Sequence, residues 1–133
     1  MRKRPLLLML MLFAVLVLVE CTAKITGTLQ VDGQAFDVKQ CRSGQAFGFS
    51  GVEFTDAGGR RVRLIANPDG TCAAALFSGN SATGDRLGQC GVLTMAAQSS
   101  RINSIVNLQG TAKLACEASG HKITGNDEFE NCH

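Results

Sequence analysis

The sequence contains no tryptophan and no tyrosine, and only seven of its 133 residues are phenylalanine. Sites that stack sugars or single-stranded bases usually depend on exposed aromatic rings. The phenylalanines that lie beyond residue 20 are Phe36, Phe47, Phe49, Phe54, Phe77 and Phe129. A hydrophobic core needs most of these rings, so the composition argues against carbohydrate or single-strand binding by stacking.

Histidine is also scarce, because the chain has only His121 and the C-terminal His133. A hydrolase or transferase needs a base held against a nucleophile or an activated water. His121 falls in a turn sequence, and no serine occupies the strained elbow of nucleophilic hydrolases. We therefore expect no enzyme activity, no catalytic residue and no cofactor. Asp127 shares the side of Ile123 and Phe129, and as a buried carboxylate with a raised pKa it is the first residue to suspect if this expectation is wrong.

The expected mature domain has no excess of charge of either sign. The whole chain carries 13 Lys and Arg against 11 Asp and Glu, and removal of residues 1–21 leaves ten of each. No general attraction to nucleic acid or to an anionic membrane follows from this balance. We expect no nucleic-acid partner.

One basic cluster stands out, formed by Arg60, Arg61 and Arg63. We interpret it as a solvated strand face whose charges discourage edge pairing. A binding patch for an anion or an acidic partner is the alternative. The acidic run Asp127, Glu128 and Glu130 offers the cluster a cross-strand match.

A long hydrophobic run occurs only at the N-terminus, where Leu6–Val19 follows the basic residues 2–4. The run has 14 residues, whereas a membrane-spanning helix needs about 20. It therefore predicts the hydrophobic region of an export signal rather than the alternative, an uncleaved anchor. We assign residues 1–20 to a lipoprotein-type signal peptide and residues 21–133 to a single β-rich domain.

Two cleavage positions follow the leader. The sequence LVEC at Leu18–Cys21 resembles the lipobox of bacterial lipoproteins, in which the cysteine becomes the acylated N-terminus, although Glu20 departs from the usual small residue. The sequence CTA at Cys21–Ala23 resembles an ordinary signal-peptidase site, which would release a soluble protein beginning at Lys24. We favour the first interpretation, with Cys21 as the lipid attachment site and the membrane as a partner through the lipid.

Cysteine occurs six times. Both cleavage interpretations remove Cys21 from pairing, either as the site of acylation or with the released peptide. In an oxidising compartment the remaining five cysteines predict two disulfides and one free thiol.

Strand parity suggests the partners. Cys41 and Cys132 both lie at strand ends, and both have the parity opposite to the inward residues of their strands, so we pair them. Cys116, near the turn of the last hairpin, would lie roughly 30 Å from Cys132 along a straight strand, too far for a bridge. Its partner is then Cys90, and Cys72 remains as the free thiol.

A zinc site is the alternative use of the same residues, since Cys116, His121, Cys132 and His133 all have ligand chemistry. Disulfide formation in an oxidising compartment would consume both thiols. We therefore expect no metal site.

Alternation with a period of two dominates the rest of the chain and predicts strands. Turn sequences separate them at Asp32-Gly33, Asp56–Gly59 and Asn67–Gly70. Ser78–Gln89 is predicted to be a polar loop, and Gly91–Ser100 fits either a strand or a short helix. The remaining predicted strands are 24–31, 34–41, 45–54, 60–66, 71–77, 102–108, 110–116 and 122–132. The pattern predicts an all-β, antiparallel β-sandwich or small β-barrel built from hairpins.

Four segments together resemble small, uncharacterised bacterial envelope lipoproteins: LVEC, VDGQAFDV, NPDGT and GHKITGNDEFENCH. There is a looser resemblance to the mycobacterial lipoprotein-antigen family, which joins a leader and cysteine to a compact β domain. The resemblance implies a bacterial envelope location, as an outer-membrane lipoprotein carrying palmitate or a periplasmic or secreted protein. It implies a β fold and no catalytic residue.

The sequence thus predicts a noncatalytic envelope lipoprotein that presents a disulfide-stabilised β domain to a protein or small ligand. The alternative is a secreted or periplasmic inhibitor of a hydrolase, similar in build to small lysozyme inhibitors. In that case we expect Ser78–Gln89 to insert into the cleft of the partner enzyme.

Overall fold

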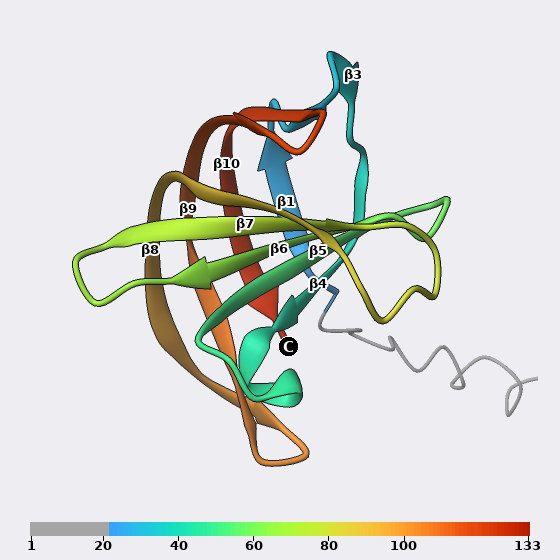
Figure 1. Cartoon of the computed structure of the whole chain (residues 1–133). Coiled ribbons are helices and arrows are strands. Elements are labelled where there is room, and N and C mark those ends of the chain that lie inside the picture. Colours follow the sequence, from blue (N-terminus) through green and yellow to red (C-terminus); the bar gives the residue numbers. More distant parts are fainter. Residues whose placement is uncertain (1–21) are drawn as a thin grey trace, which may run out of the picture.

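A computed structural model describes residues 22–133 (Figure 1). The predicted signal peptide, residues 1–20, and the predicted lipid attachment site, Cys21, lie outside the described residues. The elements in chain order are β1 (Lys24–Gly27), β2 (Gln30–Val31), β3 (Gln34–Ala35), β4 (Val38–Ser43), a 3-10 helix η1 (Gly44–Phe47), β5 (Gly51–Asp56), β6 (Arg61–Ala66), β7 (Thr71–Phe77), β8 (Asp85–Ile102), β9 (Ile105–Ala118) and β10 (His121–Cys132). Within this range, no helix has the length and apolar character needed to cross a membrane.

All ten strands of the described range belong to one antiparallel sheet, in the order β3-β2-β10-β9-β8-β7-β6-β5-β4, with β1 also pairing with β10. The sheet curls into a half-barrel (Figure 1). The predicted all-β antiparallel fold is therefore confirmed, in its barrel form.

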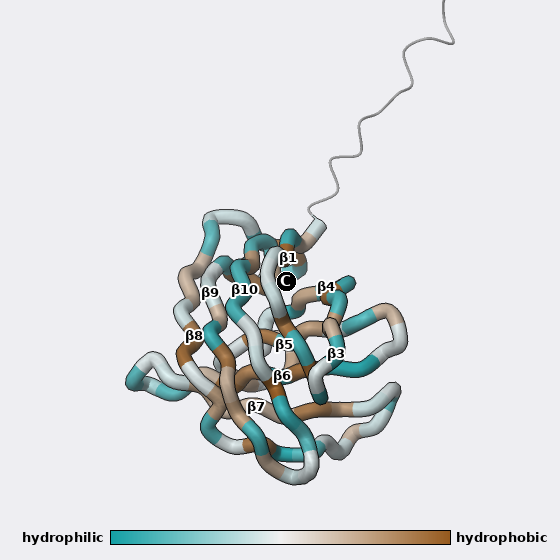
Figure 2. The backbone as a smooth tube through the Cα atoms, turned by 90° about the horizontal axis from the view of Figure 1, so that it is seen from above, coloured by the Kyte–Doolittle hydropathy of each residue, from teal (hydrophilic) through white to brown (hydrophobic). Residues whose placement is uncertain are grey.

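The interior of the curl holds the side chains that alternate inward along the strands. Val52 and Phe54 on β5 and Val62 and Leu64 on β6 are all completely buried. Burying one such side chain contributes about 1.5–3 kcal/mol. Hydrophobic and hydrophilic residues alternate along the strands, and the connections are mostly hydrophilic (Figure 2). The period of two in the sequence thus becomes an inner and an outer face.

The two disulfides join the predicted cysteines, but the predicted orientation of Cys41 and Cys132 is wrong. Both are buried in the core, at 4% and 0% exposure, because irregularities between Val38 and Gln40 and between Phe129 and Cys132 shift the alternation of the two strands. Cys41 on β4 is bonded to Cys132 on β10, with 4.8 Å between their Cα atoms, and Cys90 is bonded to Cys116. The first bond joins two strands that are far apart in the order of the sheet, so it holds the curled sheet closed. Cys72 is free and buried, and burial raises the pKa of its thiol.

The predicted turns form where their residues accept positive φ. Asp32 and Gly33 have φ of 54° and 78° and connect β2 to β3. After β6, Gly70 has φ of 88°, and the Asp69 carboxylate accepts a hydrogen bond from the Thr71 amide at 3.0 Å. The local turn chemistry therefore decides these connections.

The strand predicted at 24–31 is interrupted. Its first half, β1, pairs with β10, and its second half, β2, begins only at Gln30 and pairs with both β10 and β3. The corner between them, at Thr28–Leu29, lies beside Asp127 of β10, because the Leu29 amide donates to that carboxylate.

Two predictions about β8 and β9 need correction. β8 begins at Asp85, so the predicted loop Ser78–Gln89 ends at residue 84. The predicted strand 102–108 begins too early, since Asn103 and Ser104, with φ of 50° and 66°, form a turn and β9 starts at Ile105. Gly91–Ser100, for which strand and helix were both open, is a strand. Pairing of β8 with β9 from Gly91 to Ile102 extends these strands beyond what local composition indicates.

The strand predicted around Phe47 is also wrong, because residues 44–47 form a 3-10 helix. The Ser43 hydroxyl caps it by accepting a hydrogen bond from the Gln45 amide at 3.3 Å. Gly48, with φ of 82°, ends it. These local caps outweigh the alternation of apolar residues, and they move Phe47 to the molecular surface.

Candidate functional site

The outer face of strands β4 to β8 carries a row of charged residues in one register. Arg42 is opposite Glu53, and Glu53 is opposite Arg63. The row continues from Arg63 to Ala75 and then to Arg86. Strand alternation places all of these side chains opposite the core, because neighbours such as Val52, Phe54 and Leu64 point inward.

Glu53 lies at the centre of this row and is only 2% exposed. Its Oε2 accepts hydrogen bonds from Arg63 Nε at 2.9 Å and Nη2 at 2.7 Å. Its Oε1 lies 3.7 Å from Arg61 Nη1. One buried carboxylate thus orients two arginine side chains.

Phenylalanine rings hold the same two guanidinium groups from other sides. The Arg63 guanidinium lies over Phe49 at 4.7 Å, Phe77 at 4.8 Å and Phe47 at 5.4 Å from the ring centroids. The Arg61 guanidinium lies 4.7 Å over Phe77. Phe47 is 42% exposed, whereas Phe36, Phe54, Phe77 and Phe129 are buried, so most of the rings are buried as expected. Phe47 and Phe49 serve this outer face instead.

The face is hollowed by a cavity of about 350 Å³ between β4–β6 and residues 79–82 of the following loop. Arg42, Phe47, Glu53 and Arg61 line it. The loop is held at the edge of this cavity, because Arg61 Nη2 donates a hydrogen bond to the Ser81 carbonyl. The charged row and this cavity lie next to each other on the outer side of the sheet, and we call them together the arginine face.

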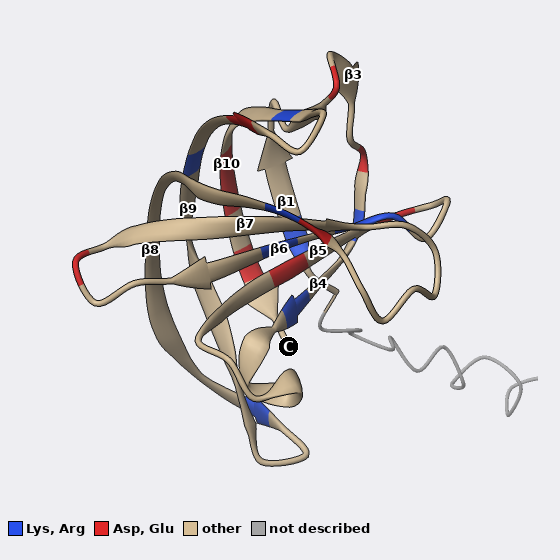
Figure 3. Ribbon diagram, in the orientation of Figure 1, with Lys and Arg blue, Asp and Glu red and all other residues tan. Residues whose placement is uncertain are grey.

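The arginine face is positively charged although the described domain is neutral. Arg42, Arg61 and Arg63 lie beside Glu53, the single acidic residue of the row, and Arg86 continues the row on β8, three strands from β5. In Figure 3 the basic segments of β4 and β6 flank the acidic segment of β5. Arg42 and Arg86 are exposed and have no ion-pair partner within residues 22–133. Arginine binds carboxylates and phosphates through paired N–H donors. The face can therefore bind an anionic group.

The predicted basic cluster is split in the structure. Arg60 pairs with Asp56, Nε to Oδ2 at 2.8 Å, whereas Arg61 and Arg63 pair with Glu53. The predicted cross-strand match with Asp127, Glu128 and Glu130 is wrong, because Arg61 and Arg63 are on β6 and the acidic run is on β10, four positions away in the sheet order.

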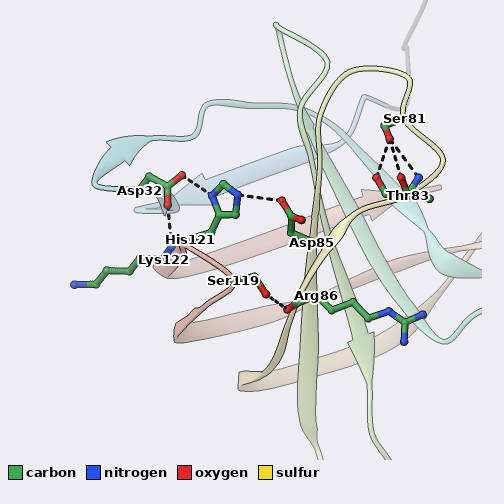
Figure 4. Close-up of polar contacts among 8 residues, drawn as sticks. All are labelled: Asp32, Ser81, Thr83, Asp85, Arg86, Ser119, His121 and Lys122. Atoms are coloured by element: carbon green, nitrogen blue, oxygen red, sulfur yellow. Dashed lines mark hydrogen bonds and ion pairs between the residues drawn. The ribbon is translucent and has the colours of Figure 1, made fainter.

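A second polar cluster joins three elements around His121, the first residue of β10 (Figure 4). His121 Nδ1 lies 2.8 Å from Asp32 Oδ2 in the β2–β3 turn, and Nε2 lies 3.1 Å from Asp85 Oδ2 at the start of β8. Asp32 also accepts from the Lys122 amide at 2.9 Å. The hydrogen bond with Asp32 is the main cause that raises the pKa of His121, and the same bond lowers the pKa of Asp32.

This cluster predicts a window of maximum stability in pH. The contribution of His121 is complete below about pH 6.5, its unperturbed pKa, and is lost as pH rises through its raised folded pKa. The contribution of Asp32 is present above about pH 3.8 and is lost as pH falls through its lowered folded pKa. The cluster therefore stabilises the fold most between these two values.

We expect His121 to titrate at a higher pH in the native protein than in Asp32→Asn, as followed by the NMR signal of its ring proton. Equal midpoints for His121 in the two proteins would show that the cluster does not hold the imidazolium.

The remaining residues singled out by the sequence lie apart from the arginine face. Asp127 is 3% exposed and points inward, as its parity predicts, and burial raises its pKa. Cys116 and Cys132 are in separate disulfides. No group of three or more His, Cys, Asp or Glu residues in the described part of the chain could hold a metal ion.

Sequence reasoning missed Glu53, Arg42 and Arg86 as members of a site. A glutamate between two inward residues of a strand is ordinarily a solvated outward side chain. Counting outward from the turn at Asp56–Gly59 would have placed Glu53 opposite Arg63, since both are about equally far from it. No local signal places Arg42 or Arg86 there, because β4 and β8 reach the face only through the sheet.

The chain matches no protein-family profile, no curated protein sequence and no solved structure. Its candidate site therefore stands on its own geometry.

Proposed function

We propose that this protein is a noncatalytic, exported envelope lipoprotein whose β domain binds an acidic segment of another protein on the arginine face. The observation that carries this proposal is the row of arginines beside one buried glutamate, next to the cavity that Arg42 and Arg61 line. Three positive charges remain after Glu53 is counted. A carboxylate-rich segment has the complementary charge.

The aromatic rings favour a protein as the partner. Arginine and aromatic residues are enriched where protein interfaces are strongest, and they act there by burial of rigid, amphipathic side chains. Phe47 is exposed beside Arg63, and Ile65 on the same outer side of β6 is 37% exposed. A partner segment that combines acidic with apolar side chains would cover both kinds of group.

The arginine face is tested with a synthetic peptide of alternating glutamate and phenylalanine, titrated into the protein and followed by NMR signals of the arginine side chains. The charge reversals Arg42→Glu and Arg86→Glu together should weaken binding about tenfold or more, because they convert attraction into repulsion. The matched control is Lys113→Glu with Lys122→Glu, two exposed lysines on the outer side of β9 and β10. Equal loss in both double variants would show attraction to net charge alone and would contradict the proposed face.

Export agrees with the two disulfides, which indicate an oxidising environment outside the cytoplasm.

Anchoring through an acylated Cys21 is the finer part of the proposal. The mature protein should carry an acylated Cys21, so that its intact mass exceeds that of residues 21–133, and Cys21→Ser should abolish the additional mass. Glu20→Gly should speed this processing, because it restores the small residue of a lipobox. A mature form that begins at Lys24 with no acyl mass would end the lipoprotein proposal.

Hydrolase inhibition is the second candidate function, and the fastened loop at residues 78–84 favours it. Every residue from Ser78 to Thr83 is exposed. The Ser81 hydroxyl donates to the Thr83 carbonyl at 2.8 Å, and Arg61 binds the Ser81 carbonyl. A preorganised, protruding loop loses little entropy on entering a cleft. An inhibitor should retain one enzyme from envelope extract in equal amount and abolish its activity.

A further inference from the structure

Within residues 22–133, the curled sheet has a seam between β1, which pairs only with β10, and β4, which pairs only with β5. At the other end of β4, the Cys41–Cys132 disulfide and a hydrogen bond from the His133 amide to the Cys41 carbonyl join β4 to the end of the chain. A cavity of about 400 Å³ lies along this seam, lined by both strands and by the chain that crosses between them. Its size falls in the range of small-molecule sites in proteins.

The buried carboxylate of Asp127 on β10 lies at this cavity. Its Oδ1 accepts a hydrogen bond from the Leu29 amide at 3.2 Å. Its Oδ2 is buried and has no hydrogen-bond partner in the described part of the chain. A buried oxygen that lacks a partner costs about 1–3 kcal/mol, and more when it is charged. The site therefore contains an unused acceptor.

Two glycines make the room that this carboxylate occupies. A Cβ atom at Gly27 would lie 2.1 Å from Asp127 Oδ1, and one at Gly125 would lie 2.7 Å from Oδ2. Gly27 also has φ of 153°, which side chains rarely adopt. The backbone on both sides of Asp127 is thus built around its side chain.

No cationic side chain within residues 22–133 forms an ion pair with Asp127. Lys39, on β4, pairs with Asp37 at 2.7 Å, and Lys24, on β1, lies 3.8 Å from Glu130. Asp37 itself lies at the rim of the cavity as a second carboxylate. Within the described residues, the seam cavity therefore has an unpaired carboxylate, Asp127, in its buried part and an exposed carboxylate, Asp37, paired with Lys39 at its rim.

We propose that the seam cavity binds a primary ammonium group carried on a short apolar arm. The ammonium would donate to Asp127 Oδ2 and offset the charge of that carboxylate, while Asp37 attracts it at the entrance. The apolar side chains that line the cavity would enclose the arm: Ile25, Leu29, Phe36 and Val38. This site is separate from the arginine face, which has the opposite charge, and it does not depend on the function proposed there.

The test uses amide NMR spectra of the folded protein titrated with n-butylammonium, n-butanol and butyrate. Butylammonium should shift the Leu29 and Thr28 amide signals in a saturable way. Butanol has the same arm without the charge, so its affinity should be lower by at least about tenfold. Butyrate should not bind. Equal shifts with butanol and butylammonium would overturn the proposal without any variant.

Asp127→Asn keeps the size and the acceptor for Leu29 and should weaken butylammonium binding about 30-fold, because a charged hydrogen bond is lost. Glu128→Gln is the matched control on the outer side of the same strand and should bind as the native protein does. Unchanged binding by Asp127→Asn would contradict the site.

If Asp127→Asn fails to fold, Asp37→Asn replaces it and should weaken binding severalfold through the rim charge. Unchanged binding by Asp37→Asn would then count against the proposal. A second titration with N-acetyl-lysine amide separates the two sources of an ammonium. Tighter binding of this probe than of butylammonium assigns the site to a lysine side chain of a partner, and tighter binding of butylammonium assigns it to a free amine.

Discussion

Replacing Cys41 and Cys132 together by alanine should lower the free energy of unfolding by about 4–5 kcal/mol, the largest effect expected of any disulfide in this domain. The two residues are 91 positions apart, so the bond closes a long loop and lowers the conformational entropy of the unfolded chain. It also joins β4 to β10 where the curled sheet meets itself. The measurement is urea unfolding followed by circular dichroism, with the change read from the midpoint at constant slope.

The second disulfide provides the comparison. Cys90 and Cys116 are 26 positions apart, so their removal should cost less, about 3–4 kcal/mol. Cys72→Ala is the matched control, since it removes a buried thiol that closes no loop. A larger loss for the Cys90 and Cys116 pair than for the Cys41 and Cys132 pair would show that closure of the half-barrel contributes little to stability.

Glu53→Leu should destabilise the protein by about 3 kcal/mol, which is the low end expected when one partner of a buried ion pair is removed. The low end applies because the Arg61 and Arg63 side chains are 21% and 22% exposed, so water still solvates part of their charge. Without Glu53, the two guanidinium groups remain close together without a counter-charge, held by the aromatic rings and, for Arg61, by the Ser81 carbonyl. Thermal unfolding measures the loss.

The double variant Glu53→Leu with Arg63→Leu is expected to recover part of that loss, because it removes an uncompensated charge together with its partner. Glu117→Gln on β9 is an exposed control and should change the free energy of unfolding by less than about 0.5 kcal/mol. A double variant less stable than Glu53→Leu alone would show that Arg63 stabilises the fold mainly through its contacts with the rings.

The inner and outer faces of each strand could be predicted from the sequence alone. Val62 and Leu64 point inward, and Arg61 and Arg63 point outward, because successive side chains of a strand alternate whatever its neighbour is. The pair Cys41 and Cys132 was predicted correctly, but the face predicted for both was wrong, because irregular strand pairing turns them into the core. Turns such as Asp32-Gly33 could be read because few residues accept positive φ.

Only the tertiary structure decided which faces meet. His121 lies between Asp32 and Asp85, which are 89 and 36 residues away in the chain. Asp127 faces inward by parity, but the seam cavity beside it exists because β1 and β4 do not pair. The period of two determines which face of the sheet a side chain occupies. It does not determine which residues lie beside it on the adjacent strands, because these depend on the strand register and on the curvature of the whole sheet. The arginine face, the histidine cluster and the seam cavity are all consequences of that long-range arrangement.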